Sequence, residues 1–142
     1  KNLDEIDKKN TTKMKEIIAE QGWPTISKVG EKASHAAWLL VQHTDHDVNF
    51  QQHFLALMES EPEGEVRRSN LAFLTDRIRI NKKQLQVYGT QFRMTESGWK
   101  PYPLEDIENV NKLRAGAGLQ TLEENLAEIK EGHIYGTKTS SL

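Results

Sequence analysis

The stretch from Glu31 to His43 constrains the fold more than any other part of the chain, because it lacks proline and glycine and repeats apolar residues at helical spacing. Its apolar arc consists of Ala33, Ala36, Ala37, Trp38, Leu39, Leu40 and Val41. A helix that is apolar around so much of its circumference must be covered by other elements. The sequence therefore predicts a central, largely buried helix.

Helices are also predicted on both sides of this central segment. Residues 11–21 have apolar positions at helical spacing, polar residues that can cap the start, and Gly22 at the end. Asp45 or Asp47 can cap a further helix that carries Phe50 and ends before Pro62. We expect this helix and the central one to pack as a hairpin.

The second half of the chain combines a short helix with predicted strands. The helix opens near Ser69, and the alternation of apolar and basic residues from Arg77 to Ile80 predicts a change to strand. The segment from Gln84 to Met94 is rich in strand-forming residues and is followed by a Ser-Gly turn. A small antiparallel hairpin or three-stranded sheet is expected around residues 78–100.

Two more helices are expected near the C-terminus. One covers Leu104 to Leu113, and another begins at Thr121 with a capping box completed by Glu124. The predicted fold class is thus mainly α (α+β), a bundle-like helical domain with a small sheet. We expect a single domain over residues 1–135, a loose tail over 136–142, and a further segment upstream of Lys1.

Composition excludes several classes of function. The chain of 142 residues has 19 Lys plus Arg against 21 Asp plus Glu, so no strong field attracts nucleic acid. No apolar run approaches the ~20 residues that span a bilayer, so the chain is not expected to be membrane-embedded. It has no cysteine, which excludes thiolate chemistry and leaves the compartment open.

His43 is the first candidate functional residue. It follows Leu40 and Ala36 at helical spacing, which places it on or beside the buried face. Imidazole titrates near neutrality, so His43 could act as a general base or a metal ligand. The alternative is a core histidine that bonds to a carbonyl or carboxylate and only stabilises the fold.

Asp45 and Asp47 lie close to His43 and His46 in sequence. Carboxylate and imidazole ligands suit zinc, manganese or iron, so a metal site is one interpretation. Alternate residues of a helix point about 200° apart, however, and converge only if the chain leaves the helix. Helix capping explains at least one of the aspartates without a metal.

Asp76 and the string Tyr88-Gly89-Thr90-Gln91 supply further polar groups. Asp76 could orient His43, as a carboxylate does in a catalytic triad, or belong to an ion-pair network with Arg77. Glycine within a predicted strand indicates a bulge or a close approach by ligand. Gln42, Tyr88, Thr90 and Gln91 are the candidate substrate-binding residues, and a bulge held by hydrogen bonds is the alternative.

The three tryptophans could line a sugar-binding cleft or serve in the core. Trp23 lies beside a helix end, Trp38 in the central helix and Trp99 in a turn, so core roles are favoured. No phosphate loop, dinucleotide fingerprint or nucleophile elbow occurs, and the sequence indicates no particular cofactor.

The assembled motifs resemble a bacterial domain family of unknown function over about residues 10–126. The resemblance rests on Gly22-Trp23-Pro24, Ala36-Ala37-Trp38-Leu39-Leu40-Val41-Gln42-His43 with Asp45 and Asp47, Leu71-Ala72-Phe73-Leu74-Thr75-Asp76-Arg77, Gln86-Val87-Tyr88-Gly89-Thr90-Gln91-Phe92, Arg114 and Gly118-Leu119. Val48 stands where members often carry proline. The resemblance implies bacterial origin and, in many members, an exported or lipid-anchored context, but no reaction.

Two functions remain open from the sequence. In the first, the chain is a small hydrolase-like enzyme in which His43 is the base, alone or as a metal ligand with Asp45, and Asp76 orients it. In the second, a secreted or periplasmic module binds a small molecule or protein, and the same residues hold the fold. Buried residues whose hydrogen bonds are all made internally would favour the second.

Overall fold

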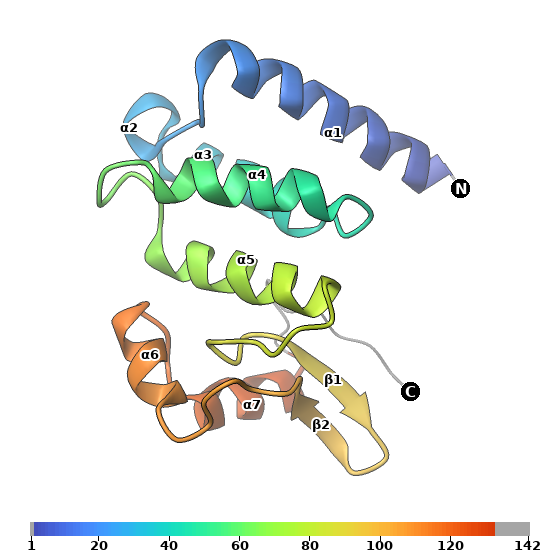
Figure 1. The fold of residues 1–142 in the computed structure, drawn as a ribbon, viewed down its shortest axis with the longest axis vertical. Coiled ribbons are helices and arrows are strands. Elements are labelled where there is room, and N and C mark those ends of the chain that lie inside the picture. The colour runs from blue at the N-terminus through green and yellow to red at the C-terminus, as the bar shows by residue number, and fades with distance from the viewer. Residues whose placement is uncertain (1, 133–142) are drawn as a thin grey trace. The chain divides into compact units, whose positions relative to one another are not determined.

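The computed structural model describes residues 2–132 (Figure 1). Within this range the chain forms seven helices and one two-stranded antiparallel sheet, which confirms the predicted mainly helical class with a small hairpin. The chain divides into two compact units, Lys1–Arg67 and Arg68–Leu142, and each is described by itself. The single domain predicted over residues 1–135 stays a prediction.

The first unit contains four helices, α1 (Asn2–Gln21), α2 (Ile26–Val29), α3 (Glu31–Gln42) and α4 (Val48–Glu59). A short turn joins α3 to α4, and the two contact each other and run in opposite directions, as the sequence predicts (Figure 1). Helix α1 lies along this pair and is antiparallel to α3 (Figure 1).

Large side chains fill the interior of the first unit. Trp23, Trp38 and Phe54 are each 1% exposed, and the ring centroids of Trp23 and Phe54 lie 6.0 Å apart. Met14 and Ile18 bury one face of α1. These contacts confirm the core roles predicted for the first two tryptophans and explain why the Gly-Trp-Pro link is anchored.

The second unit begins with α5 (Arg68–Asn81), continues through β1 (Phe92–Thr95) and β2 (Gly98–Pro101), and ends with α6 (Val110–Gly116) and α7 (Leu122–Lys130). The strands pair in register from Phe92 opposite Pro101 to Thr95 opposite Gly98. A small apolar core lies between the hairpin and the last helices. Its buried members are Phe92, Val110, Leu122 and Ile129, with Trp99, Leu104 and Leu126 packed against them.

The strand predicted to begin near Arg77 is wrong, because α5 continues to Asn81. The helical ladder extends beyond that residue, and the Lys82 amide donates to the Ile78 carbonyl at 3.0 Å. Alternation over only four residues does not exclude a helix. In α5, Ile78 is buried and Ile80 is half-buried. Residues 84–91 form no strand either, so the sheet of the described residues has two strands rather than three.

Two of the helices start at residues other than those predicted, and a third has the predicted start. Helix α1 starts well before residue 11. Thr11 does not cap a new helix there, and its hydroxyl instead donates to the Asp7 carbonyl at 2.7 Å within the continuing helix. Helix α6 starts at Val110, later than the predicted Leu104. Helix α7 has the predicted capping box, with Thr121 and Glu124 bonded reciprocally.

Among the described residues, none of the helices is both long and apolar enough to cross a bilayer. The tail predicted over residues 136–142 lies outside the described residues.

Candidate functional site

Asp76 is the centre of the polar cluster in the second unit. It lies within α5, is fully buried, and accepts hydrogen bonds from the segment that follows the helix. The backbone amides of Val87, Tyr88 and Thr90 donate to its oxygens at 2.8, 3.0 and 3.0 Å. The Thr90 hydroxyl adds a fourth donor at 2.9 Å. One carboxylate thus organises the turn that carries three of the predicted binding residues.

The environment of Asp76 acts on its protonation in two directions. Burial raises the pKa of Asp76 above the ordinary value, because the charged form loses its hydration. The hydrogen bonds from Tyr88, Thr90 and Val87 oppose this rise, because they stabilise the carboxylate form. A buried carboxylate that accepts from backbone amides is suited to holding a loop in place.

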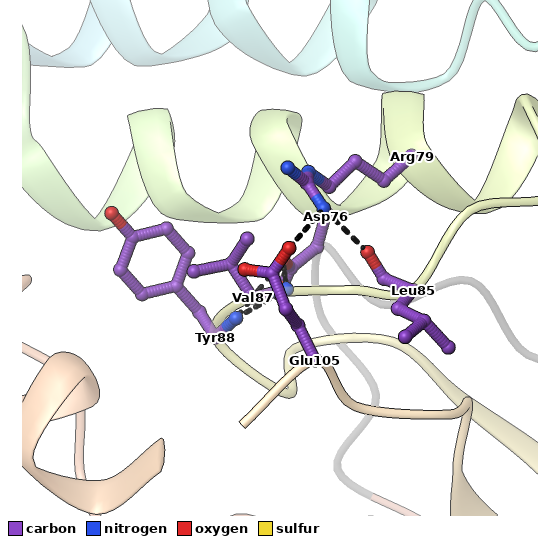
Figure 2. Close-up of polar contacts among 6 residues, drawn as sticks. All are labelled: Asp76, Arg79, Leu85, Val87, Tyr88 and Glu105. Carbon is purple, nitrogen blue, oxygen red and sulfur yellow. Dashed lines mark hydrogen bonds and ion pairs between the residues drawn. The ribbon is translucent and has the colours of Figure 1, made fainter. Parts of the chain in front are cut away.

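Figure 2 shows a second connection from α5 to the same segment. The Arg79 guanidinium donates to the Leu85 carbonyl at 2.9 Å and to a carboxylate oxygen of Glu105 at 3.2 Å. In the same view the backbone of Tyr88 faces Asp76, whereas its ring extends away from the carboxylate (Figure 2). Tyr88 therefore joins the Asp76 cluster through its amide.

Two buried glutamines hold the other end of this loop. The side-chain amide of Gln86 donates to the carbonyls of Gln91 and Tyr102 at 3.0 and 2.8 Å, and its oxygen accepts from the Gln91 amide at 3.0 Å. The Gln91 side chain donates to the Thr90 hydroxyl at 2.8 Å and accepts from Arg77 at 3.4 Å. Thr90 and Gln91 are both fully buried.

Arg114 completes the cluster, although the sequence did not mark it as a site residue. The residue is 1% exposed, and its guanidinium donates to the carbonyls of Tyr88 and Gly89, each at 2.9 Å, and to the Asn125 side chain at 3.0 Å. Burial lowers the pKa of Arg114, and the charge of Asp76 opposes this. An arginine in a glycine-bounded helix end was visible in the sequence, but its burial was not.

Gly89 has a geometric reason to be glycine. Its φ is +66°, and a Cβ at this position would lie 2.9 Å from Leu122 and 3.2 Å from Leu104. The loop backbone thus packs directly on the small core, so the predicted close approach involves the protein's own side chains. The prediction of a bulge within a strand is wrong, since residues 88–91 lie in a loop.

In the first unit, the predicted residues Gln42, His43 and Asp45 lie at the turn after α3. Gln42 is fully buried. The Gln51 side chain donates to the carbonyls of Val41 and Gln42 at 3.1 and 3.2 Å, and to Asp45 at 3.4 Å. Asp45 therefore takes part in closing this turn.

His43 is exposed, so the prediction that it lies on or beside the buried face is wrong. The helix ends at Gln42, and His43 is its C-cap with φ −92° and ψ 7°. His43 shares one face of α3 with Ala36 and Leu40, and this face is exposed. The buried face of α3 carries Ala37, Trp38 and Val41 instead. Asp47 instead takes the predicted capping role, with its carboxylate accepting from the Phe50 amide at 3.0 Å.

His43 lines an apolar cavity of about 430 Å³ inside the first unit. Its walls come from one stripe of α1, one stripe of α3 and the start of α4. They are lined by Asp7, Asn10, Thr11, Met14, Ala36, Leu39, Leu40, His43, Thr44 and Phe50. The volume lies within the range of about 300–1,000 Å³ that is typical of small-molecule sites.

Two stripes of the sequence face this cavity. Asp7, Thr11 and Met14 have the spacing of one helical face, and α3 presents a similar stripe from Ala36 to His43. Because the sequence predicts a helix that starts only at residue 11, Asp7 and Asn10 are not among the candidate residues. The cavity lies between these two stripes, one on α1 and one on α3.

The seven predicted site residues fall into two groups, with Gln42, His43 and Asp45 in the first unit and Asp76, Tyr88, Thr90 and Gln91 in the second. Their convergence on one site stays a prediction. Across the part of the chain that the structure describes, no cluster of three or more histidines and carboxylates has the geometry to hold a metal ion.

Comparison with known proteins identifies the family but no activity. No curated protein and no solved structure is detectably similar to this chain. One family model matches residues 1–140, nearly the whole chain, and it is described as a family of unknown function, DUF6624. The sequence motifs predicted such a relationship. The chain belongs to the DUF6624 family.

Proposed function

We propose that the chain is a ligand-binding module whose site is the cavity between α1 and α3. The single observation that carries this proposal is a cavity of about 430 Å³ with an apolar body and a few polar groups at its wall. This combination is what small-molecule sites commonly show. The ligand would be a small molecule with a substantial apolar part.

The way α1 is attached supports the proposal. Met14 and Ile18 anchor its C-terminal half in the core, and Lys15 pairs with Asp47 at 3.2 Å. Closer packing of α1 on α3 would fill the cavity and cover Leu40 on its wall. Leu40 is instead 47% exposed, so α1 leaves this apolar surface uncovered. An apolar ligand would cover this surface, and burial contributes about 25 cal/mol per Å² of apolar area.

The polar cluster of the second unit also favours binding over catalysis. Asp76 and Gln91 are fully buried, and both hydrogen-bond to groups of the loop that they hold. Residues committed in this way stabilise a fold, whereas catalytic groups need access to a reacting atom. The second unit accordingly serves as a scaffold in this proposal.

The test is a fluorescence titration with N-phenyl-1-naphthylamine, a neutral apolar probe that brightens in apolar surroundings. The Ala36→Trp variant places a large side chain in the cavity wall and should abolish the enhancement. Ala56 is an exposed alanine of α4 outside this wall, so Ala56→Trp is the matched control and should bind as the parent protein does. Equal binding by both variants would reject the cavity as the site.

A hydrolase-like enzyme is the second candidate, because the imidazole of His43 and the carboxylate of Asp7 line the same cavity. In this version His43 is the general base, and Asp45 lies in the same turn of the first unit. A general base contributes about 10²–10⁴-fold to a rate. Hydrolysis of p-nitrophenyl butyrate that survives His43→Ala would reject it. The exported context implied by the family resemblance also stays a prediction.

A further inference from the structure

We infer that the cavity of the first unit selects amphipathic cations, that is, an amine attached to an apolar chain or ring. This inference rests on the proposed binding function and adds the chemical class of the ligand. It is carried by the distribution of polar groups along the cavity and by its wall, to which residues 2–132 contribute no lysine or arginine.

The two ionisable groups of the cavity wall, Asp7 and His43, lie toward the same end of the cavity. Helix α1 runs antiparallel to α3 (Figure 1), so the N-terminal part of one lies along the C-terminal part of the other. Asp7 and Asn10 come from the early part of α1, and His43 follows the last turn of α3. Met14 and Ala36 are the lining residues farthest along in the other direction. A ligand with one polar head fits this division.

The polar end is rich in hydrogen-bond acceptors. The Thr11 hydroxyl donates to the Asp7 carbonyl at 2.7 Å, and the Thr44 hydroxyl donates to the Leu40 carbonyl at 2.6 Å. With their protons used in the helices, both hydroxyls offer lone pairs to a ligand. The ionised carboxylate of Asp7 only accepts. An ammonium group carries three donors and no acceptor, so it complements this end.

The charges of α1 are arranged in the same sense. Lys8, Lys9 and Lys13 lie on a different face of the helix, where they line a separate shallow hollow. Lys15 is paired with Asp47 at 3.2 Å and lies 5.3 Å from the centre of the Phe50 ring. Asp7 forms no ion pair within residues 2–132. Its negative charge is therefore available to a cationic head.

The test compares three probes with the same eight-carbon chain, namely octylamine, 1-octanol and octanoate, by displacement of N-phenyl-1-naphthylamine at pH 8. At this pH octylamine is cationic and octanoate anionic, so the comparison varies the charge of the head group. An exposed charge pair contributes modestly, and we expect octylamine to bind about threefold to fivefold more tightly than 1-octanol. Octanoate should bind more weakly than 1-octanol.

Asp7→Asn should equalise octylamine and 1-octanol while leaving 1-octanol binding unchanged. Asp4→Asn removes an acidic residue of the same helix that does not line the cavity and is the matched control, which should retain the preference. Binding of 1-octanol without a preference for the amine, or a preference for octanoate, would overturn the cation inference and leave the binding function standing. Failure of all three probes to bind would overturn both.

Discussion

Replacing Asp76 by alanine should destabilise the protein more than any surface substitution, because one side chain satisfies four donors. The change leaves the amides of Val87, Tyr88 and Thr90 without their acceptor. Each buried donor left unsatisfied costs about 1–3 kcal/mol. Thr90 is fully buried, whereas Val87 and Tyr88 are half-buried and can regain water. We therefore expect a loss of about 3–5 kcal/mol in the free energy of unfolding, as for a broken buried polar network.

The measurement is urea denaturation followed by circular dichroism, together with hydrogen exchange of the loop amides. Asp76→Asn keeps one oxygen and the volume, so it should lose less than Asp76→Ala. Glu108→Ala removes an exposed carboxylate of the same unit and should leave the midpoint unchanged. A loss below about 1 kcal/mol for Asp76→Ala, with the Thr90 amide still protected from exchange, would refute the view that this carboxylate organises the loop.

Three further substitutions test other parts of the account. Gly89→Ala should lower the free energy of unfolding by about 1–3 kcal/mol, because the new Cβ would meet packed side chains at a positive φ. Gly116 has open space around it, so Gly116→Ala is the control and should not lower stability. Similar melting temperatures for the two variants would contradict this. Arg114→Lys should raise the exchange rates of amides in the 88–91 loop, since one ammonium cannot reproduce four donations to separate acceptors; an unchanged exchange pattern would count against it. The hydrogen bond from the Phe50 amide lowers the pKa of Asp47 in the folded state. The Asp47 carboxylate therefore contributes to the free energy of unfolding above its unfolded pKa, near 3.8, and this contribution is lost as the pH falls through the folded pKa. Asp47→Ala should thus cost about 1 kcal/mol at pH 7 and clearly less at pH 2.5, and a pH-independent difference in urea unfolding would disprove this.

The helical part of the fold could be predicted because its signals are local. The apolar arc from Glu31 to His43, the cap at Asp47 and the capping box at Thr121 each act within a few residues. The end of helix α5 is not predicted, because Ile78 and Ile80 alternate with arginines over a stretch too short to distinguish the helical period from the strand period. The order of the 84–91 loop depends on Asp76 and Arg114, which are distant in sequence.

The candidate site could be predicted only in part for the same reason. Asp76, Thr90 and Gln91 hydrogen-bond to one another, as polar residues in apolar surroundings must find partners, but the site that they were predicted to form with His43 stays a prediction. The donors that they satisfy, and the cavity at His43, depend on how separate segments pack. His43 was placed wrongly because the face of α3 that it shares with Ala36 and Leu40 is exposed, whereas Ala37, Trp38 and Val41 form the buried face.

The most direct test of the binding proposal is a set of amide ¹H–¹⁵N correlation spectra recorded while 1-octanol is added to labelled protein. The account predicts saturable shifts that cluster on the cavity wall, at residues such as Asn10, Leu39 and His43, and their loss in Ala36→Trp. No saturable shifts, or shifts confined to residues 68–132, would contradict it.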